Sequence, residues 1–197
     1  VMTPKVILGS SSPYRKELLS RLGIPFECVS PDVDETPLSG ETPQALCQRL
    51  ARLKAQAVHA LRADAIVIGS DQVAVLGNKI LGKPHTHERA VAQLAAMQGH
   101  RIDFLTALCV IDTRGQLYET MVPTEVHMKV LSAEAIEAYL LREKPYNCAG
   151  SAKIETLGIA LMESVRSDDP TALIGLPLIA TVKLLSKAGC HVLPGLE

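Results

Sequence analysis

The chain has 197 residues, and 47% of them are hydrophobic, which is enough to bury a core of its own. We therefore expect one domain over residues 1–197. The 20 basic and 21 acidic residues almost cancel, so the chain lacks the overall basic field that attracts a nucleic-acid polymer, and we expect no such partner.

The cysteines and the apolar runs indicate the compartment. The five cysteines are widely spread and form no C-x-x-C pair, which argues against a disulfide framework and against a zinc site. We find no signal peptide and no apolar run long enough to cross a bilayer. The sequence thus predicts a protein of the reducing cytoplasm with no membrane partner.

Predicted strands and helices alternate along the chain. Short or alternating apolar runs predict strands, and apolar positions repeated every three to four residues predict helices. In chain order we expect a strand at 5–9, a helix at 12–23, a strand at 26–30, an acidic loop at 31–43, a helix at 43–62, a strand at 65–69, a short hairpin at 73–76 and 79–81, a helix at 87–97, two long paired strands at 101–112 and 117–130, a helix at 132–142, an irregular segment at 146–175 and a helix at 178–188. This order indicates an α/β fold with an antiparallel pair in its middle.

The turn after the first strand has the features of a phosphate-binding site. Ser12 is a good helix N-cap, and the turn presents backbone N–H groups and the hydroxyls of Ser10 and Ser12 at a helix N-terminus, where the dipole favours an anion. Arg15 and Lys16 lie in the first helical turn, where cations are unfavourable unless an anion sits nearby. An ordinary capped helix with solvated cations is the alternative, and the turn alone does not decide between the two.

A second polar group, Gly69-Ser70-Asp71-Gln72, follows the predicted strand at 65–69. Ligands of α/β sheets bind beyond the carboxyl ends of strands, so Asp71 and Gln72 are placed to act on one. The alternative is a turn aspartate that caps local N–H groups. The position at the end of a strand favours a functional role.

Four further charged side chains give weaker signals. Glu35 lies in an acidic loop, which suits a hard cation such as Mg²⁺ but is by itself more typical of a solvated loop. Lys54 and Lys83 read, one at a time, as surface lysines. Glu155 lies in a Gly-bounded segment, where it can accept from the N–H edge of a base such as guanine or cap a turn.

Taken together, these side chains make a consistent set. The cations Arg15, Lys54 and Lys83 can hold a polyphosphate, and Asp71 and Glu35 can bind a metal or activate water. The spacing of Cys, Ser and His residues does not indicate a covalent nucleophile.

The set resembles the Maf family of nucleoside triphosphate pyrophosphatases. The resemblance is collinear over essentially the whole chain, so it is specific although each motif is short. The segments that carry it are residues 10–19, 34–36, the helix around Lys54, 69–72, 82–84, 149–158 and 175–177.

The resemblance implies a fold and a reaction. The fold is an elongated α/β domain in which helices flank a mixed sheet and a cleft separates two lobes. The reaction is hydrolysis of a nucleoside triphosphate between its α- and β-phosphates, which gives a monophosphate and pyrophosphate and uses a divalent cation, Mg²⁺ or Mn²⁺. Asp71 corresponds to the proton acceptor. We therefore expect catalytic roles for Asp71, Glu35, Lys54 and Lys83, phosphate binding by Ser10, Ser12 and Arg15, and metal binding by Glu35 and Asp71.

Within the family, three positions resemble the 7-methyl-GTP pyrophosphatase branch. That branch typically carries an aromatic residue, Gln and Glu where this chain has Tyr14, Gln72 and Glu155, whereas the dTTP/UTP branch usually carries Arg, Thr and Gln. N7-methylguanine is a cation, which an electron-rich ring attracts. A carboxylate suits both its charge and its N–H groups. One departure is that the branch commonly has Trp at the position of Tyr14. We expect these three residues to select 7-methyl-GTP.

Two other functions stay open at this point. One is a Maf-type pyrophosphatase specific for dTTP or UTP, and the other is a nucleotide-binding regulatory module. The acidic loop, which is of use with a metal but not to a pure anion binder, favours an enzyme. We expect a nucleotide as the partner, and the sequence leaves open whether the protein forms a homodimer.

Overall fold

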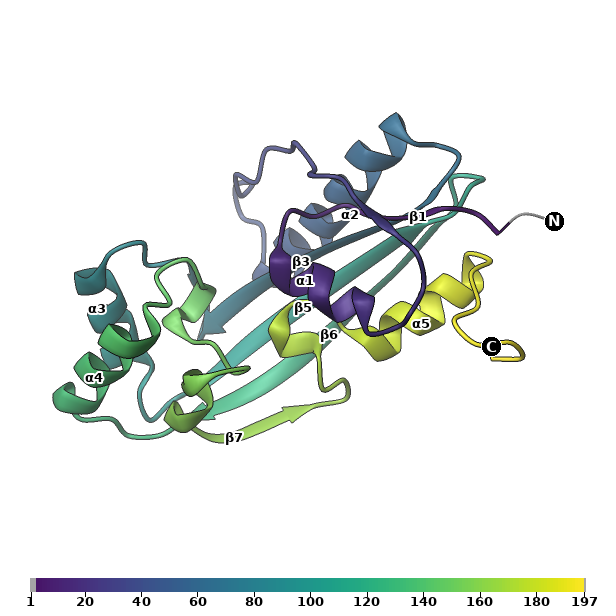
Figure 1. The fold of residues 1–197 in the computed structure, drawn as a ribbon. Helices are drawn as coiled ribbons and strands as arrows, with labels where there is room; N and C mark the ends of the chain where they lie inside the picture. The colour runs from purple at the N-terminus through teal and green to yellow at the C-terminus, as the bar shows by residue number, and fades with distance from the viewer. Residues whose placement is uncertain (1–2, 197) are drawn as a thin grey trace. The chain divides into compact units, whose positions relative to one another are not determined.

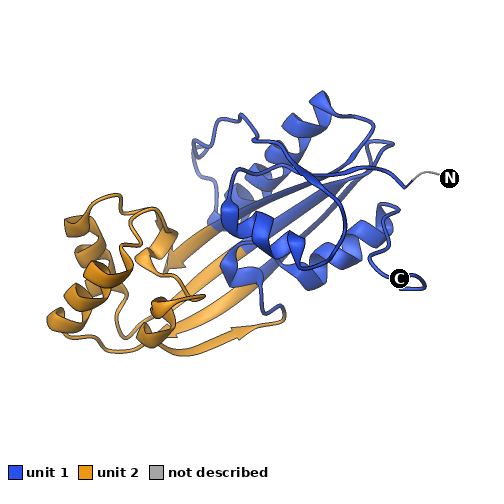
Figure 2. Cartoon of the chain, viewed as in Figure 1, with its two compact units in different colours: residues 1–72, 106–122, 169–197 blue, residues 73–105, 123–168 orange. Residues whose placement is uncertain are grey.

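The computed structural model describes residues 3–196, and their contacts form two compact units (Figure 2). Unit 1 contains the residues up to 72, residues 106–122 and the residues from 169 onward, and unit 2 contains residues 73–105 and 123–168. Several strands therefore contribute residues to both units.

The described residues form one seven-stranded sheet in the order β2-β1-β3-β5-β6-β7, with β4 paired to β3 (Figure 1). β1 is parallel to β2 and β3, whereas the β3–β4 and β6–β7 pairs are antiparallel. The expected α/β class with a mixed sheet is confirmed. The strands are β1 (Val6–Leu8), β2 (Glu27–Cys28), β3 (Ile66–Leu76), β4 (Lys79–Leu81), β5 (Arg101–Ile111), β6 (Leu117–Met128) and β7 (Met162–Ser167).

The helices lie close to where the apolar periodicity predicted them, and short 3-10 turns join them in the second half of the chain. The α-helices are α1 (Pro13–Ser20), α2 (Pro43–Leu61), α3 (His87–Met97), α4 (Ala133–Glu143) and α5 (Leu178–Lys187), and the 3-10 turns are η1 (Ala149–Ser151), η2 (Leu157–Leu161) and η3 (Ala172–Ile174). No helix within residues 3–196 is both long enough and apolar enough to cross a membrane.

Unit 1 packs helices on both faces of its part of the sheet (Figure 1). Alternate residues of a strand point to opposite faces, and the buried apolar residues of β1 and β3 follow this period. The residues of β1 and β3 that point to one face pack with the buried leucines of α1 and α5. Together they form a single core cluster, whose members include Leu8, Leu18, Ile68 and Leu184. α2 covers the other face.

Glycine at position 69 allows α2 to approach β3 closely. A Cβ atom at Gly69 would lie less than 3.0 Å from backbone atoms of Ala51 and Ala55 in α2, a distance that real Cβ atoms essentially never show. Because Lys54 lies between these two residues along α2, the same approach brings its side chain to β3. The glycine therefore positions a charged group as well as a helix.

In unit 2, α3 and α4 pack against each other. His87, at the start of α3, contacts the hydroxyl of Tyr146 through Nδ1 at 2.8 Å and the carboxylate of Glu137 in α4 through Nε2 at 2.8 Å. Leu94 and Leu140 are buried. Polar and apolar contacts together hold the helix pair.

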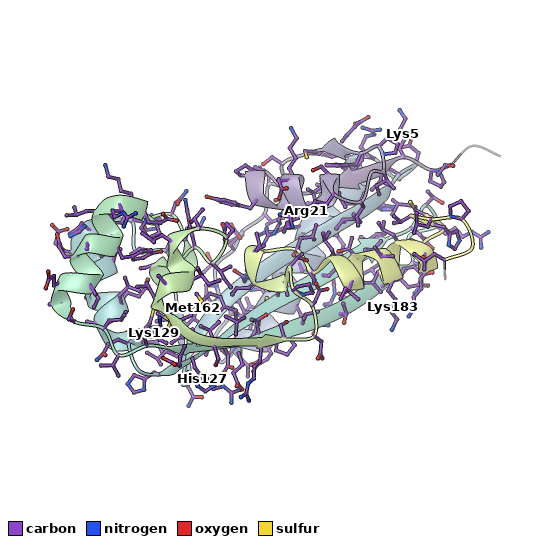
Figure 3. The ribbon with its side chains drawn as sticks, turned by 60° about the horizontal axis from the view of Figure 1, so that its bottom comes forward. Lys5, Arg21, His127, Lys129, Met162 and Lys183 are labelled. Carbon is purple, nitrogen blue, oxygen red and sulfur yellow. The ribbon has the colours of Figure 1, made fainter. Side chains whose placement is uncertain are left out.

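Two differences from the expected elements affect the interpretation. Residues 146–175 are not uniformly irregular, because they contain β7 and all three 3-10 turns. β7 is a largely exposed strand at the edge of the sheet (Figure 3). Its pairing with β6 shifts register beside Met162. An exposed strand with such a shift does not need a regular apolar alternation, and the sequence therefore did not predict it. The predicted strands at 65–69 and 73–76 are one strand, β3, which runs through Gly69-Ser70-Asp71-Gln72.

Candidate active site

The turn between β1 and α1 has the predicted capped geometry. Ser12 is the N-cap in extended backbone conformation, its Oγ accepts from the N–H of Arg15 at 3.3 Å, and Pro13 occupies the first helical turn. Ser10 is buried, and its Oγ accepts from the N–H of Ser12 at 3.0 Å. Each hydroxyl therefore still has its own hydrogen to donate to a ligand.

The two cations of this helix start differ in their surroundings. Lys16 is exposed, as the alternative of a capped helix with solvated cations expects. Arg15 is partly buried, and its Nε donates to the carbonyl of Gly175 at 2.8 Å. Burial lowers the pKa of the Arg15 guanidinium, and the nearby carboxylates of Asp71 and Glu35 partly offset this effect. Arg15 is thus a partly buried cation held by a backbone carbonyl, and the solvated alternative is wrong for it.

Asp71 lies inside β3 and not after its end, so the predicted position was wrong. The strand continues because β5 pairs with it on one side. On the other side β1 pairs with β3 only as far as Ile68. Residues 69–72 of β3 therefore extend beyond the end of their parallel neighbour β1.

Two of the predicted catalytic carboxylates, those of Asp71 and Glu35, meet at the ammonium of a third predicted residue, Lys54. Its Nζ lies 2.8 Å from Oδ1 of Asp71 and 2.9 Å from Oε1 of Glu35. The side chains of Lys54 and Asp71 are only 12% and 10% exposed, whereas that of Glu35 is 59% exposed. Lys54 is therefore not a surface lysine, and one end of its carboxylate cluster opens to solvent.

The surroundings of Asp71 tune it as a base. Burial raises the pKa of the Asp71 carboxyl above its usual value, the charges of Lys54 and Arg15 pull this pKa down, and the like charge of Glu35 pushes it up. A carboxylate whose pKa is raised is a stronger base when it is ionised. Asp71 thus combines burial, raised basicity and a neighbouring cation.

Gln72 points to the opposite face of β3 from Asp71. Its Nε2 lies 3.0 Å from each of three acceptors, which are Oγ1 of Thr106 and the carbonyls of Ala172 and Leu173 in η3, and its two hydrogens are shared among them. Tyr14, the second predicted specificity residue, is half-buried at the start of α1. Both belong to unit 1, as do all the site residues described so far.

Lys83 and Glu155 belong to unit 2. Both are exposed, and both charges act on the thiol of Cys148. Burial is the main cause of the raised pKa of Cys148, the Glu155 carboxylate adds to it, and the Lys83 ammonium opposes it.

Sequence reasoning missed the side chains that hold η3. Asp169 is only 3% exposed, and its Oδ2 accepts from the N–H groups of Ile179 at 2.9 Å and Ala180 at 3.2 Å, which caps α5. Its Oδ1 accepts from the backbone N–H and the hydroxyl of Thr171, each at 3.2 Å. The available signal was the Asp-Asp-Pro-Thr run shortly before a predicted helix, since Asp is a common capping residue.

The comparisons with known proteins identify the family of the chain. The family described as Maf-like protein matches residues 5–188. A protein of Cupriavidus metallidurans named 7-methyl-GTP pyrophosphatase is 57% identical over 187 residues, which are 94% of each chain. A protein of Thiobacillus denitrificans with the same name is 56% identical over 97% of this chain and 96% of its own.

A crystal structure of a nucleoside-triphosphatase (dITP/XTP pyrophosphatase) from Mycobacterium abscessus aligns with a TM-score of 0.44 and 17% identity, over 63% of this chain and 74% of its own, a likeness too slight to carry an argument. The family match covers nearly the whole chain and includes every residue of the predicted site. The protein therefore belongs to the Maf family.

Proposed function

We propose that this protein hydrolyses 7-methyl-GTP between its α- and β-phosphates and releases pyrophosphate. The observation that carries the proposal is the convergence of Asp71 and Glu35 on Lys54, in the electrostatic field of the partly buried Arg15. Relatives at 57% and 56% identity bear the name of this activity. A simple structural ion pair needs one cation and one carboxylate. Here a cation and two carboxylates meet where β3 continues beyond the end of β1.

In the proposed mechanism Asp71 takes a proton from the attacking water. Its raised pKa makes it a better base than an exposed aspartate. Lys54 lies 2.8 Å from the Asp71 carboxylate, so its ammonium can transfer its contact to a phosphate oxygen when the triphosphate enters. Arg15, fixed by the Gly175 carbonyl, supplies a second positive charge toward the developing negative charge.

The turn between β1 and α1 is proposed to hold phosphate oxygens. Ser10 and Ser12 accept backbone hydrogen bonds and keep their hydroxyl hydrogens for a ligand. The N-terminus of α1 favours an anion at the same place. Lys83 stays a predicted ligand of the polyphosphate on the basis of the family resemblance.

A divalent cation is part of the proposal, and the residues fit one that arrives with the nucleotide. Among residues 3–196 no group of three or more His, Cys, Asp and Glu side chains could form a complete protein cage for a metal. Mg²⁺ is usually held by one or two carboxylates together with substrate phosphates and water, and Glu35 and Asp71 provide such a pair. A cation held there supplies charge neutralisation on the phosphates.

Base selection is proposed to rest on Tyr14, Gln72 and Glu155. The Tyr14 ring suits the cationic N7-methylguanine through cation–π attraction, and the Glu155 carboxylate suits its charge. The competing function is a pyrophosphatase for dTTP or UTP. We propose that the protein acts in the cytoplasm, and size-exclusion chromatography tests whether it forms a homodimer.

The test is a substrate screen with separate detection of pyrophosphate and phosphate. 7-Methyl-GTP, GTP, dTTP and UTP are compared with Mg²⁺, with Mn²⁺ and with a chelator. We expect pyrophosphate release that needs the metal and a kcat/KM that is highest for 7-methyl-GTP. A higher kcat/KM for dTTP or UTP would assign the competing function, and release of single phosphates would contradict the proposed bond cleavage.

A further inference from the structure

The side-chain amide of Gln72 has only one orientation that its surroundings accept. Its Nε2 lies 3.0 Å from the carbonyl oxygens of Ala172 and Leu173. Backbone carbonyls accept hydrogen bonds and never donate them, so an amide oxygen at this place would face two other oxygens. The NH₂ group, and not the oxygen, must therefore point toward η3.

Thr106 strengthens this choice. Its side chain is fully buried in β5, and its Oγ1 donates to the carbonyl of Ala172 at 2.9 Å. A hydroxyl has a single hydrogen, so toward Gln72, at 3.0 Å, Thr106 can only accept. The carbonyl of Ala172 thus sets the direction of the Thr106 hydroxyl, and the hydroxyl in turn selects the nitrogen of Gln72.

The acceptors themselves are fixed in place. The carbonyl of Gly175, at the end of η3, accepts from Arg15 at 2.8 Å and from the Ser70 hydroxyl at 3.2 Å. Asp169 and Thr171 hold the start of the same segment through the bonds that cap α5. η3 therefore presents a rigid row of carbonyls to the half-buried side chain of Gln72.

We propose that Thr106 is a positioning residue for base recognition, because it locks the Gln72 amide so that Oε1 is the atom offered to the substrate. Within the described part of the chain, Oε1 of Gln72 has no hydrogen-bond partner of its own. An amide held in this way is an acceptor only. This inference rests on the proposed function, and it assigns a specificity for bases that carry a ring N–H on their pairing edge, as guanine does at N1 and adenine does not.

Guanine and its N7-methyl derivative fit such an acceptor. Their pairing edge carries N–H groups at N1 and N2, whereas adenine has an acceptor at N1 and a single donor group, the amino group at C6. A freely rotating glutamine would serve both bases, since it could turn its NH₂ group toward adenine. An Oε1 locked opposite the 1-position of the base therefore accepts from the N1–H of guanine but meets the N1 lone pair of adenine.

The experiment measures kcat/KM for 7-methyl-GTP, GTP and ATP in the unmodified protein and in Thr106→Val, which keeps the shape and removes the hydroxyl. We expect the ratio of kcat/KM for GTP to kcat/KM for ATP to fall about three- to tenfold, which is the effect of one neutral hydrogen bond. Thr106→Ser, which restores the hydroxyl, should restore the ratio. Thr181→Val is the matched control, because Thr181 is also fully buried and its hydroxyl bonds only within the start of α5, to Pro177.

A second readout follows the amide directly. In the unmodified protein the side-chain NH₂ of Gln72 should give a slowly exchanging ¹H–¹⁵N NMR signal, and Thr106→Val should accelerate its exchange. If Thr106→Val does not fold, Gln72→Met, which offers no acceptor, must lower the GTP to ATP ratio instead.

Three results would overturn the inference. The first is an unchanged ratio in folded Thr106→Val, and the second is an unchanged ratio in Gln72→Met. The third is an equal fall in Thr181→Val, which would show a general loss of packing. Absence of pyrophosphate release from every triphosphate by the unmodified protein would instead overturn the proposed function together with the inference that rests on it.

Discussion

The two faces of β3 hold neighbouring residues by different means. On the α2 face, Asp71 is paired with the Lys54 ammonium at 2.8 Å, and the charges of Glu35 and Arg15 also act on it. On the η3 face, Gln72 is surrounded by neutral acceptors, which are one hydroxyl and two carbonyls. Charged partners change a pKa and can exchange contacts with a phosphate, whereas neutral partners fix the direction of an amide. The comparison teaches that one strand can supply reactivity on one face and recognition on the other.

The largest expected effect tests the charged face. Asp71→Asn keeps the shape of the side chain but cannot accept a proton, so kcat should fall roughly 10²-fold or more in the pyrophosphate-release assay. Asp112→Asn is the matched control, since Asp112 is also buried in unit 1 but serves a turn by accepting from the N–H of Arg114 and that of Gln116. Near-normal kcat in Asp71→Asn would remove Asp71 from the role of base.

Lys54→Met tests the cation of the same face. Loss of a charge that stabilises the transferred phosphate should lower kcat/KM by about 10²-fold. Because the Lys54 charge lowers the pKa of Asp71, its removal should also move the acid limb of the pH profile to higher pH. Lys183→Met, an exposed lysine of α5 (Figure 3), should leave both quantities unchanged. An acid limb that stays in place or moves to lower pH would contradict the assigned coupling.

Asp169→Asn tests the support of the neutral face. The buried carboxylate accepts from backbone N–H groups at both oxygens, and an amide would direct its own N–H groups against some of them. The free energy of unfolding, measured by denaturant titration, should fall by about 2 kcal/mol. The neighbouring Asp168 is exposed, so Asp168→Asn should change the free energy of unfolding by less than about 0.5 kcal/mol. Equal effects of the two substitutions would refute the capping role.

Tyr14→Ala tests recognition of the methylated base. The variant loses the Tyr14 ring and with it a cation–π contact of about 0.5–2 kcal/mol. The preference for 7-methyl-GTP over GTP should therefore fall by a factor of about two to thirty. Tyr14→Phe keeps the ring and should keep the preference, and Glu155→Gln should reduce it by removing the carboxylate charge. If Tyr14→Ala and Tyr14→Phe behave alike, the ring does not select the methylated base.

The smallest effect is a shift in pH dependence. The Glu35 carboxylate raises the pKa of Asp71 by repulsion between like charges, so Glu35→Gln should move the acid limb of kcat/KM to lower pH, opposite to Lys54→Met. Since burial raises the pKa of folded Asp71 above 3.8, the folded state holds this proton more tightly than the unfolded chain does. Stability should therefore fall as pH rises through the raised pKa, and Asp71→Asn should remove that part of the dependence.

Local sequence alone determined the elements whose signals are short-range. The Ser12 cap followed by Pro13 predicts the start of α1, because capping depends on the next few residues only. The apolar periods predict α2 and the paired strands β5 and β6 to within a residue or two. The motif residues that resemble the Maf family were also identified by sequence, and the family is confirmed.

Only the tertiary structure decided how these residues act together. Sequence spacing places Glu35, Lys54 and Asp71 far apart, and their meeting depends on the close approach of α2 to β3 that Gly69 allows. The continuation of β3 through Asp71 depends on pairing with β5, which no local pattern reports. The orientation of the Gln72 amide depends on carbonyls about 100 residues further along the chain. Contacts between distant segments decide burial and hydrogen-bond partners, and these in turn decide basicity and recognition.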